Sequence, residues 1–215
     1  MKINFRNILF SLLWIPLVGI GVFRFWSLVS RAGGHWGITN NMSALSLVGY
    51  TVFYALIFFF TLTRLSRIQA VDGAWPRAAA FIGSFLPVLI VLFPERSLPL
   101  ALLVLSLAFI ILGDIFAIYG VVSLGTSFSV IPESRAIVTD GAYRFVRHPM
   151  YLFEYITAIG AFMQYASPYS ALLLVVYLWF QIKRINNEEA LLEKTFPEYV
   201  AYKAKTPARL IPGIY

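Results

Sequence analysis

Long apolar runs separated by short polar breaks dominate the hydropathy pattern of this chain. A helix needs roughly 20 apolar residues to cross the ~30 Å hydrocarbon layer of a bilayer, and several runs approach or exceed that length. The pattern therefore predicts an all-α fold, a polytopic membrane helical bundle with about five to six transmembrane helices. The predicted helices cover residues 8–28, 42–63, about 78–93, 100 to about 124, 150–165 and 169 to about 183.

The last two predicted helices differ from the others. Residues 150–165 reach only about 24 Å at 1.5 Å per residue, so this segment is either a thin span or one arm of a re-entrant hairpin. No proline or glycine interrupts the chain between Tyr169 and Phe196. The final helix is therefore expected to run for about 28 residues and to project beyond the membrane. The aromatic and basic residues from Phe196 to Lys203 then suit a short amphipathic helix at the lipid headgroups.

Composition indicates a single membrane domain, residues 1–215, with N-terminal spans in 1–99 and a core in 100–215. Of the 215 residues, 60% are hydrophobic and 13% are charged, and the mean hydropathy is +0.78. The lack of cysteine excludes disulfides, thiolate metal sites and cysteine nucleophiles. Two histidines are too few for a histidine-rich metal cluster, so no metal is expected.

The 17 basic residues give a net charge of +7, and most of them lie in loops between apolar runs. An anionic lipid surface explains that placement more simply than a nucleic acid, which is not expected as a partner. If the chain crosses six times and both ends share one side, fourteen basic residues fall on that side and three on the other. Because basic residues resist translocation, both termini are predicted to be cytoplasmic.

The segment Gly141–Tyr151, called the box here, is the first candidate for chemistry. It places two arginines and one of the two histidines among tyrosines, directly before an apolar helix. Charged groups at the mouth of a membrane segment are costly to keep, so a function is expected at this position. Each group also has a structural alternative. His148 could cap the following helix, and Arg144 and Arg147 could anchor the helix at the interface.

Further charged residues fall within or near the apolar helices. Arg184, Glu188 and Glu189 lie on the projecting part of the last helix, where Arg184 and Glu188 are one turn apart and could form a solvated ion pair. Asp114 and Glu154 interrupt apolar runs, so each is expected to face protein or water. We expect Asp114 to be paired structurally, whereas Glu154 could point into a ligand cavity. In a transporter or channel-like protein, which is an alternative class, these two carboxylates would line the pathway.

Three ordered blocks, with Leu124–Ser129 before them, resemble the isoprenylcysteine carboxyl methyltransferase family of membrane enzymes, which is related to the phospholipid N-methyltransferases. The resemblance covers roughly residues 120–212. The blocks are Ile137-Val-Thr-x-Gly-x-Tyr-Arg144, Arg147-His-Pro-x-Tyr151 and Arg184-x3-Glu-Glu-x-Leu-x4-Phe-x2-Tyr-x2-Tyr202.

The resemblance implies a cytoplasmic S-adenosylmethionine site between the box and the C-terminal helices, with a catalytic methyltransferase core in residues 100–215. A lipid or other lipophilic acceptor would enter from the bilayer, for O-methylation of a carboxylate or N-methylation of a lipid amine. Arg184 and Glu188 would be catalytic, and Phe153 and Glu154 would meet the acceptor. The residues implied to bind the cofactor are Val138, Gly141, Tyr143, Arg147, His148, Tyr151, Glu188 and Glu189.

Two positions depart from the family pattern. Phe153 stands where a glycine is frequent and would narrow the acceptor tunnel, which argues against a prenylated peptide as acceptor. Pro197 stands where a second glycine is frequent. Membrane reductases of the steroid type share part of the C-terminal resemblance, and such an enzyme would need a nicotinamide cofactor; this is the third class.

Overall fold

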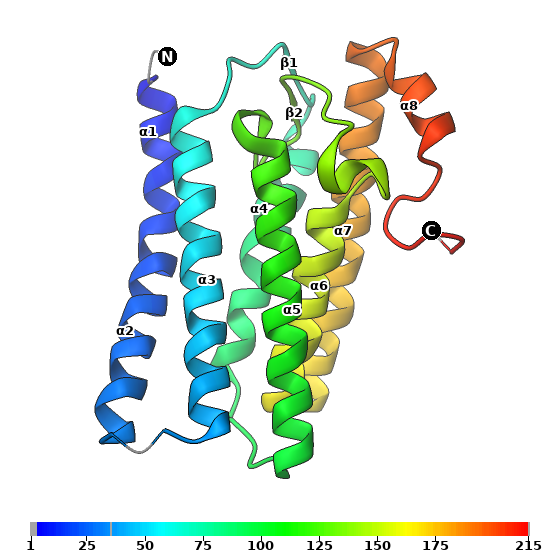
Figure 1. Cartoon of the computed structure of the whole chain (residues 1–215). Helices are drawn as coiled ribbons and strands as arrows, with labels where there is room; N and C mark the ends of the chain where they lie inside the picture. Colours follow the sequence, from blue (N-terminus) through cyan, green and yellow to red (C-terminus); the bar gives the residue numbers. More distant parts are fainter. Residues whose placement is uncertain (1–3, 35, 215) are drawn as a thin grey trace.

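The computed structural model describes residues 4–34 and 36–214, which form an elongated bundle of helices (Figure 1). Apart from two strands of two residues each, the regular structure is helical, which confirms the predicted fold class. The α-helices are α1 (Phe5–Ser11), α2 (Ile15–Ala32), α3 (Ile38–Thr63), α4 (Ala74–Phe85), α5 (Leu100–Leu124), α6 (Pro149–Gln164), α7 (Pro168–Thr195) and α8 (Tyr199–Lys205).

Within the described residues, four helical stretches are long and apolar enough to cross a membrane, and they correspond to the first four of the five to six predicted spans. Three of them begin three to four residues before the predicted starts, because the helices continue into polar residues that precede each apolar run. The four stretches are Phe5–Ala32, Ile38–Thr63, Ala74–Leu92 and Leu100–Ser127.

Proline interrupts two of these stretches. The turn Leu12–Trp14 separates α1 from α2 just before Pro16, and the turn Leu86–Leu92 follows α4 and contains Pro87. Both turns are 3-10 helix, because a proline has no N–H to donate to the fourth preceding carbonyl and its ring crowds that carbonyl. The hydropathy pattern does not reveal these changes of helix type.

The helices α5 and α6 pack closely because glycines face the partner helix. A Cβ on Gly160 would lie 2.8 Å from both Ile110 Cγ1 and the Ser106 carbonyl oxygen, so only glycine allows this approach. The Ser106 hydroxyl donates to the Gly160 carbonyl at 2.8 Å. Small residues and interhelical hydrogen bonds of this kind are the usual means of helix association where the surrounding lipid is as apolar as the side chains.

The final pair, α6 and α7, forms an antiparallel hairpin. Its turn is fixed by a capping box, in which the Ser167 hydroxyl accepts from the Ser170 N–H at 3.1 Å and the Ser167 N–H donates to the Ser170 hydroxyl at 2.8 Å. Pro168 occupies the first turn of α7, where its missing N–H costs nothing. The 28 residues of α7 confirm the predicted length of the last helix.

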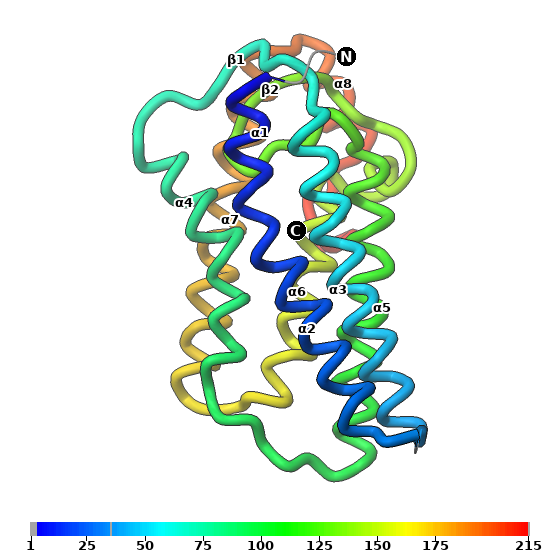
Figure 2. The backbone as a smooth tube through the Cα atoms, turned by 90° about the vertical axis from the view of Figure 1, so that its left-hand side faces the viewer, coloured from blue at the N-terminus to red at the C-terminus, as the bar shows by residue number. Residues whose placement is uncertain are grey.

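One end of the bundle carries the start of α1, the two strands and α8, and we call it the site end (Figures 1 and 2). Here β1 (Gln69–Ala70) pairs antiparallel with β2 (Glu133–Ser134), a bridge that the sequence pattern does not predict. The segment after α8 folds back over the box, where the N–H groups of Arg147 and His148 donate to the carbonyls of Ala208 and Arg209 at 3.0 and 2.9 Å. The tail therefore fixes the backbone of the box.

Candidate functional site

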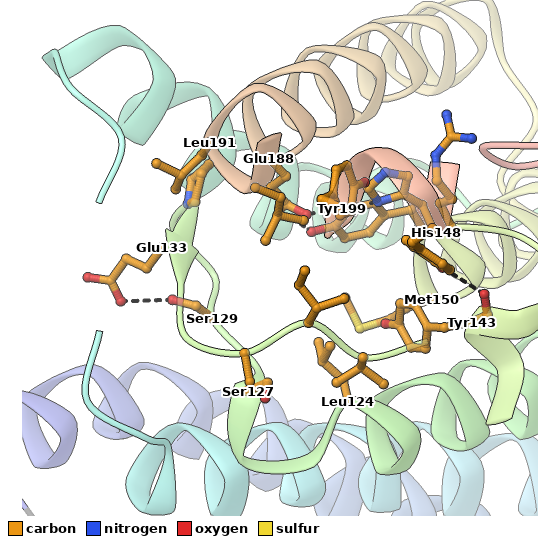
Figure 3. A pocket seen from close by; sticks show the side chains of 18 of the residues that line it. Leu124, Ser127, Ser129, Glu133, Tyr143, His148, Met150, Glu188, Leu191 and Tyr199 are labelled. Atoms are coloured by element: carbon orange, nitrogen blue, oxygen red, sulfur yellow. Dashed lines mark hydrogen bonds and ion pairs between the residues drawn. The ribbon is translucent and has the colours of Figure 1, made fainter. Parts of the chain in front are cut away.

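A partly open cavity lies at the site end, between residues 124–151, the last turns of α7, and α8 (Figure 3). Its volume is about 90 Å³, and we call it the site-end cavity. Its apolar lining includes Leu124, Val138, Met150 and Leu191. The polar and aromatic side chains that line it are Ser127, Ser129, Glu133, Tyr143, Arg147, His148, Tyr151, Glu188, Tyr199 and Tyr202.

Glu188 is the carboxylate of α7 that faces this cavity. It accepts a hydrogen bond from the Tyr151 hydroxyl, and its Oε2 lies 4.0 Å from Nδ1 of His148. Its side chain is 19% exposed, compared with 3% for Glu189. Glu188 is therefore held in place and still accessible to a ligand.

Glu189 lies behind the cavity wall and is surrounded by nitrogen donors. Its Oε1 accepts from Arg147 Nε at 2.7 Å and lies 3.2 Å from His148 Nε2, and its Oε2 accepts from Arg209 Nε at 3.1 Å. Burial alone would raise the pKa of the Glu189 carboxyl, but hydrogen bonds from His148 and Arg147 outweigh it and lower the pKa to about 2. Glu189 is not among the residues that line the cavity.

The contacts of the box show which of its residues cap a helix or anchor it at the interface. Arg147 is buried and also donates from Nη1 to the carbonyls of Thr206 and Pro207 at 2.7 and 2.6 Å, so it is not an interfacial anchor. The His148 side chain makes no capping hydrogen bond to α6 and instead meets the two glutamates. Arg144 is exposed and its guanidinium stacks on the ring of Phe145 at 4.4 Å, as an interfacial residue would.

Arg184 and Glu188 do not form the ion pair that their spacing suggests, because Tyr151 lies between them. Arg184 Nη2 donates to the Tyr151 hydroxyl at 3.2 Å, and that hydroxyl donates to Glu188. Arg184 Cζ also sits 4.5 Å from the centre of the Tyr151 ring. Arg184 is only 2% exposed, so neighbouring protein groups fix the position of its guanidinium.

The same guanidinium continues the network toward the membrane. Arg184 Nη1 donates to Gln181 Oε1 at 3.1 Å, and Gln181 Nε2 donates to Glu154 at 3.0 Å and to the Tyr177 hydroxyl at 2.8 Å. We call this row of connected side chains the polar wall. Its members, in order, are Glu188, Tyr151, Arg184, Gln181, Glu154 and Tyr177.

A second, larger cavity lies on the far side of the polar wall, among the membrane helices. Its volume is about 550 Å³, and we call it the membrane cavity. Glu154 and Tyr177 line it, as does Asp114, whose Oδ1 accepts from Thr157 at 3.1 Å. Asp114 Oδ2 is buried and has no hydrogen-bond partner among residues 4–34 and 36–214. The expectation that Asp114 is paired structurally thus holds for one of its two oxygens.

Four predicted site residues line neither cavity, namely Arg184 and Glu189, described above, and Gly141 and Phe153. Gly141 has a φ of +60°, and a Cβ there would meet Ser123 Oγ at 2.6 Å, so its role is to let the box pack against α5. Phe153 stacks on Phe116 at 4.8 Å and lines neither cavity. At 100° per residue, a position two residues after Tyr151 falls on the opposite side of α6.

The spacing arguments assign no site role to several residues that the structure brings to the site. Tyr199 and Tyr202 are buried in the cavity wall, so the tyrosines of α8 face the protein. The Tyr202 hydroxyl donates to the Tyr143 carbonyl at 2.6 Å and thereby ties α8 to the box. Both tyrosines are part of the third sequence block, and this is the signal that could have identified them. For Gln181 the sequence offers no comparable signal.

The bundle and its two cavities define a helical membrane protein with a polar site at one end. Residues 104–194 match the profile described as the isoprenylcysteine carboxyl methyltransferase (ICMT) family. Over these 91 residues, fewer than half of the chain, the protein is similar to this family, and it is a multi-pass integral membrane protein.

Similar relatives carry names from the same family. The protein-S-isoprenylcysteine O-methyltransferase of Schizosaccharomyces pombe is 38% identical over 110 residues, which are 48% of this chain and 47% of the relative. Protein-S-isoprenylcysteine O-methyltransferase B of Arabidopsis thaliana is 33% identical over 110 residues, 48% of this chain and 56% of the relative. A probable enzyme of the same name from Oryza sativa subsp. indica is 32% identical over 126 residues, 55% of this chain and 66% of the relative. The chain spans about half the length of the first two relatives.

Proposed function

We propose that this protein is a membrane methyltransferase that binds S-adenosylmethionine in the site-end cavity and a lipophilic acceptor in the membrane cavity. The polar wall is the observation that supports this most directly, because it presents side chains to both cavities at one place. The match to the family profile and the methyltransferase names of the relatives support the same activity.

The side chains of the site-end cavity suit this cofactor. S-adenosylmethionine, when bound, supplies an electrophilic methyl group on a sulfonium centre. Glu188 offers a carboxylate for an ammonium or a ribose diol, and the faces of Tyr143 and Tyr151 suit a cationic centre. Leu124 and Leu191 offer apolar contact for a base. At about 90 Å³ the cavity is smaller than the whole cofactor, so the cofactor would also occupy its open side.

In this proposal Glu189 and Gly141 are positioning residues. Glu189 orients Arg147 and His148, and Gly141 allows the box to approach α5. The two neighbouring glutamates thus have separate roles, Glu188 toward the ligand and Glu189 toward the protein. We do not assign an acceptor contact to Phe153.

Methyl transfer is an in-line displacement, so alignment of the acceptor and exclusion of water must provide most of the rate. Arg184 lines neither cavity, but in the polar wall it lies between Tyr151, which lines the site-end cavity, and Gln181, which donates to Glu154 of the membrane cavity. Its planar guanidinium could align, through two parallel hydrogen bonds, the carboxylate of an acceptor that reaches the wall. A carboxylate is already ionised at neutral pH and needs no base.

A second candidate is N-methylation of a lipid amine. The carboxylates of Glu154 and Asp114 line the membrane cavity and favour a cationic or hydrogen-bond-donating acceptor. An amine must lose a proton before it attacks, and Glu154, the carboxylate of the polar wall that lines the membrane cavity, could accept that proton.

We further propose that the site end faces the cytoplasm. The loops and helix ends at the site end carry Arg6, Arg64, Arg67 and Arg135, and Lys203 lies on α8 at the same end. Basic residues of this kind stay on the cytoplasmic side during insertion.

Calorimetric titration of the detergent-purified chain with S-adenosylmethionine tests the cofactor site. We expect saturable binding, and Glu188→Ala should weaken it about 30-fold or more, because removing a hydrogen-bonded charge from a desolvated contact costs about 2 kcal/mol or more. Glu193→Ala is the matched control, since Glu193 lies on the same helix and pairs only with Lys203 among the described ion pairs. No saturable binding, equal binding in both variants, or displacement by a nicotinamide cofactor would contradict the proposal.

Mass spectrometry identifies the acceptor. A membrane lipid extract is incubated with the protein and isotopically labelled S-adenosylmethionine. The expected result is one labelled methyl group on a single lipophilic species. Mild base releases the label from an ester but not from an amine, which separates the two candidate reactions.

A further inference from the structure

A second group of charged side chains lies at the site end, where one carboxylate is surrounded by four arginines. Glu133 Oε1 lies 3.7 Å from Arg6 Nη2 and 3.4 Å from Arg67 Nη1, and its Oε2 lies 3.7 Å from Arg64 Nη1 and in hydrogen-bond contact with Arg135. Arg6 lies in α1, Arg64 and Arg67 lie in the segment after α3, Glu133 lies in β2, and Arg135 directly follows β2. We call them the arginine cluster.

The arginine cluster carries an excess of positive charge. Four guanidinium groups surround one carboxylate, and no other acidic side chain of the described residues forms an ion pair with these arginines. Burial and the neighbouring Arg135 outweigh the attraction of Glu133 and lower the pKa of Arg64 to about 10. Like charges held this close repel one another, so a second anion would stabilise the arrangement.

The cluster has an inner and an outer pair of arginines. The side chains of Arg64 and Arg135 are 3% and 1% exposed and also bond to protein groups, Arg64 to Asn7 Oδ1 at 2.9 Å and Arg135 to the Leu65 carbonyl. Arg6 and Arg67 form the rim, with side chains 35% and 47% exposed. The inner pair therefore holds the fold together, while the rim is open to a ligand.

Two donors of the cluster are unused. Nε of Arg6 and Nε of Arg135 are buried and have no acceptor within the part of the chain that the structure describes. A buried donor without an acceptor is costly, and an anion with several oxygens could satisfy donors that one carboxylate leaves free.

The position of the cluster suggests which anion it meets. Arg6 is the second residue of α1 and Arg64 directly follows α3, and both helices belong to stretches long and apolar enough to span a membrane. The guanidinium groups therefore lie at the depth where a bilayer places its headgroup phosphates.

We propose that the arginine cluster is a binding site for a phosphate group, carried by an anionic phospholipid or by a soluble phosphate ester. Guanidinium groups bind phosphate oxygens in pairs, and a phosphate would supply the negative charge that Glu133 alone does not. This proposal is separate from the proposed methyltransferase activity, because none of the four arginines lines the site-end cavity, although Glu133 does.

Thermal unfolding of the detergent-purified full chain tests the site with three probes, which are dioleoyl phosphatidic acid, dioleoyl phosphatidylcholine and inorganic phosphate. We expect phosphatidic acid to raise the unfolding temperature saturably and phosphatidylcholine to have a much smaller effect. A lipid source is indicated if inorganic phosphate neither stabilises the protein nor competes. A soluble source is indicated if inorganic phosphate does both.

The variant Arg6→Gln/Arg67→Gln removes only the exposed rim. We expect at least about tenfold weaker binding of phosphatidic acid, since two charge-assisted contacts are lost. The matched control Arg77→Gln/Arg144→Gln removes two other exposed arginines and should keep the response of the unaltered protein. The proposal would be refuted if both double variants lost phosphatidic acid binding equally, or if the rim variant kept the full response.

A third variant distinguishes phosphate binding from a purely structural role of the cluster. Glu133→Gln removes the only carboxylate that pairs with these arginines within residues 4–34 and 36–214, so it should lower stability in the absence of probe and strengthen phosphate binding severalfold. If Glu133 serves only to hold the arginines together, the variant is destabilised and no phosphate probe restores its unfolding temperature. That result would also refute the proposal.

Discussion

The two cavities are built from different parts of the chain. The residues that line the site-end cavity all fall between Leu124 and Tyr202, and most of them lie within the segment that matches the family. The membrane cavity also draws on α2, α3 and the turn that follows α4, which lie outside that segment. Under the proposed function, the residues that bind the cofactor therefore lie mostly in the segment that matches the family. The choice of acceptor depends largely on helices outside that segment.

The polar wall is the place where the two parts of the chain meet. Figure 2 shows α4 beside α7, and the contact is made possible by Gly83 of α4. A Cβ at Gly83 would lie 3.1 Å from Cδ of Arg184. The N-terminal half of the chain thus forms part of the enclosure of Arg184, and the separation of roles between the cavities can be tested at this arginine.

The largest effect is expected for Arg184→Lys. Lysine keeps the charge but loses the planar fork that contacts both Tyr151 and Gln181. Displacing an acceptor by about 1 Å lowers the rate about 100-fold, so kcat should fall by about that factor. The Kd of S-adenosylmethionine should stay within about threefold of its value in the unaltered protein. Steady-state kinetics and calorimetry measure the two quantities. Lys183→Arg, the reverse exchange at the adjacent exposed position, serves as the control.

An intermediate effect is expected when the membrane cavity is filled. Ala158 is buried and lines that cavity, so Ala158→Phe should raise the KM of the acceptor about tenfold, because the added ring takes up space that an apolar acceptor would occupy. Binding of S-adenosylmethionine should be unchanged. Ala101→Phe adds the same ring at an exposed position of α5 and should change neither quantity. Weaker cofactor binding in Ala158→Phe would show that the two cavities are not separate in function.

Sequence patterns alone predict the helices well, because burial in a bilayer demands long apolar runs. The 28 residues of α7 follow from the lack of proline and glycine, and the box stands out because charge at a membrane boundary is costly. Six predicted residues, Val138, Tyr143, Arg147, His148, Tyr151 and Glu188, come together around one cavity. The resemblance of the ordered blocks to a known family, and not spacing alone, selected these residues.

Other features depend on contacts that span many residues and leave no periodic signal. Glu188 and Glu189 are neighbours in sequence, yet only the positions of Arg147, His148 and Arg209 around Glu189 show which carboxylate faces the protein. The membrane cavity likewise arises where six of the described helices, α2 to α7, fail to fill the space between them. Hydropathy specifies that these helices are apolar but does not fix how closely their side chains pack.

The smallest effect is expected on stability at acid pH, and it should further distinguish the role of Glu189 from that of Glu188. The pKa of Glu189 falls from its ordinary value near 4.5 to about 2 in the folded protein, so its ion pairs stabilise the fold fully above pH 4.5 and are lost as the pH drops toward 2. Glu189→Gln should therefore be less stable than the unaltered chain at pH 7 and lose less stability between pH 4.5 and 2. Some acid sensitivity should remain, because the pKa of Glu133 is lowered as well, where Arg135 and Arg64 outweigh the effect of burial. Unfolding temperatures recorded across this range measure the slope, and Glu193→Gln on the exposed side of α7 is the control. An acid slope identical to that of the unaltered protein would show that Glu189 does not hold the box through its charge.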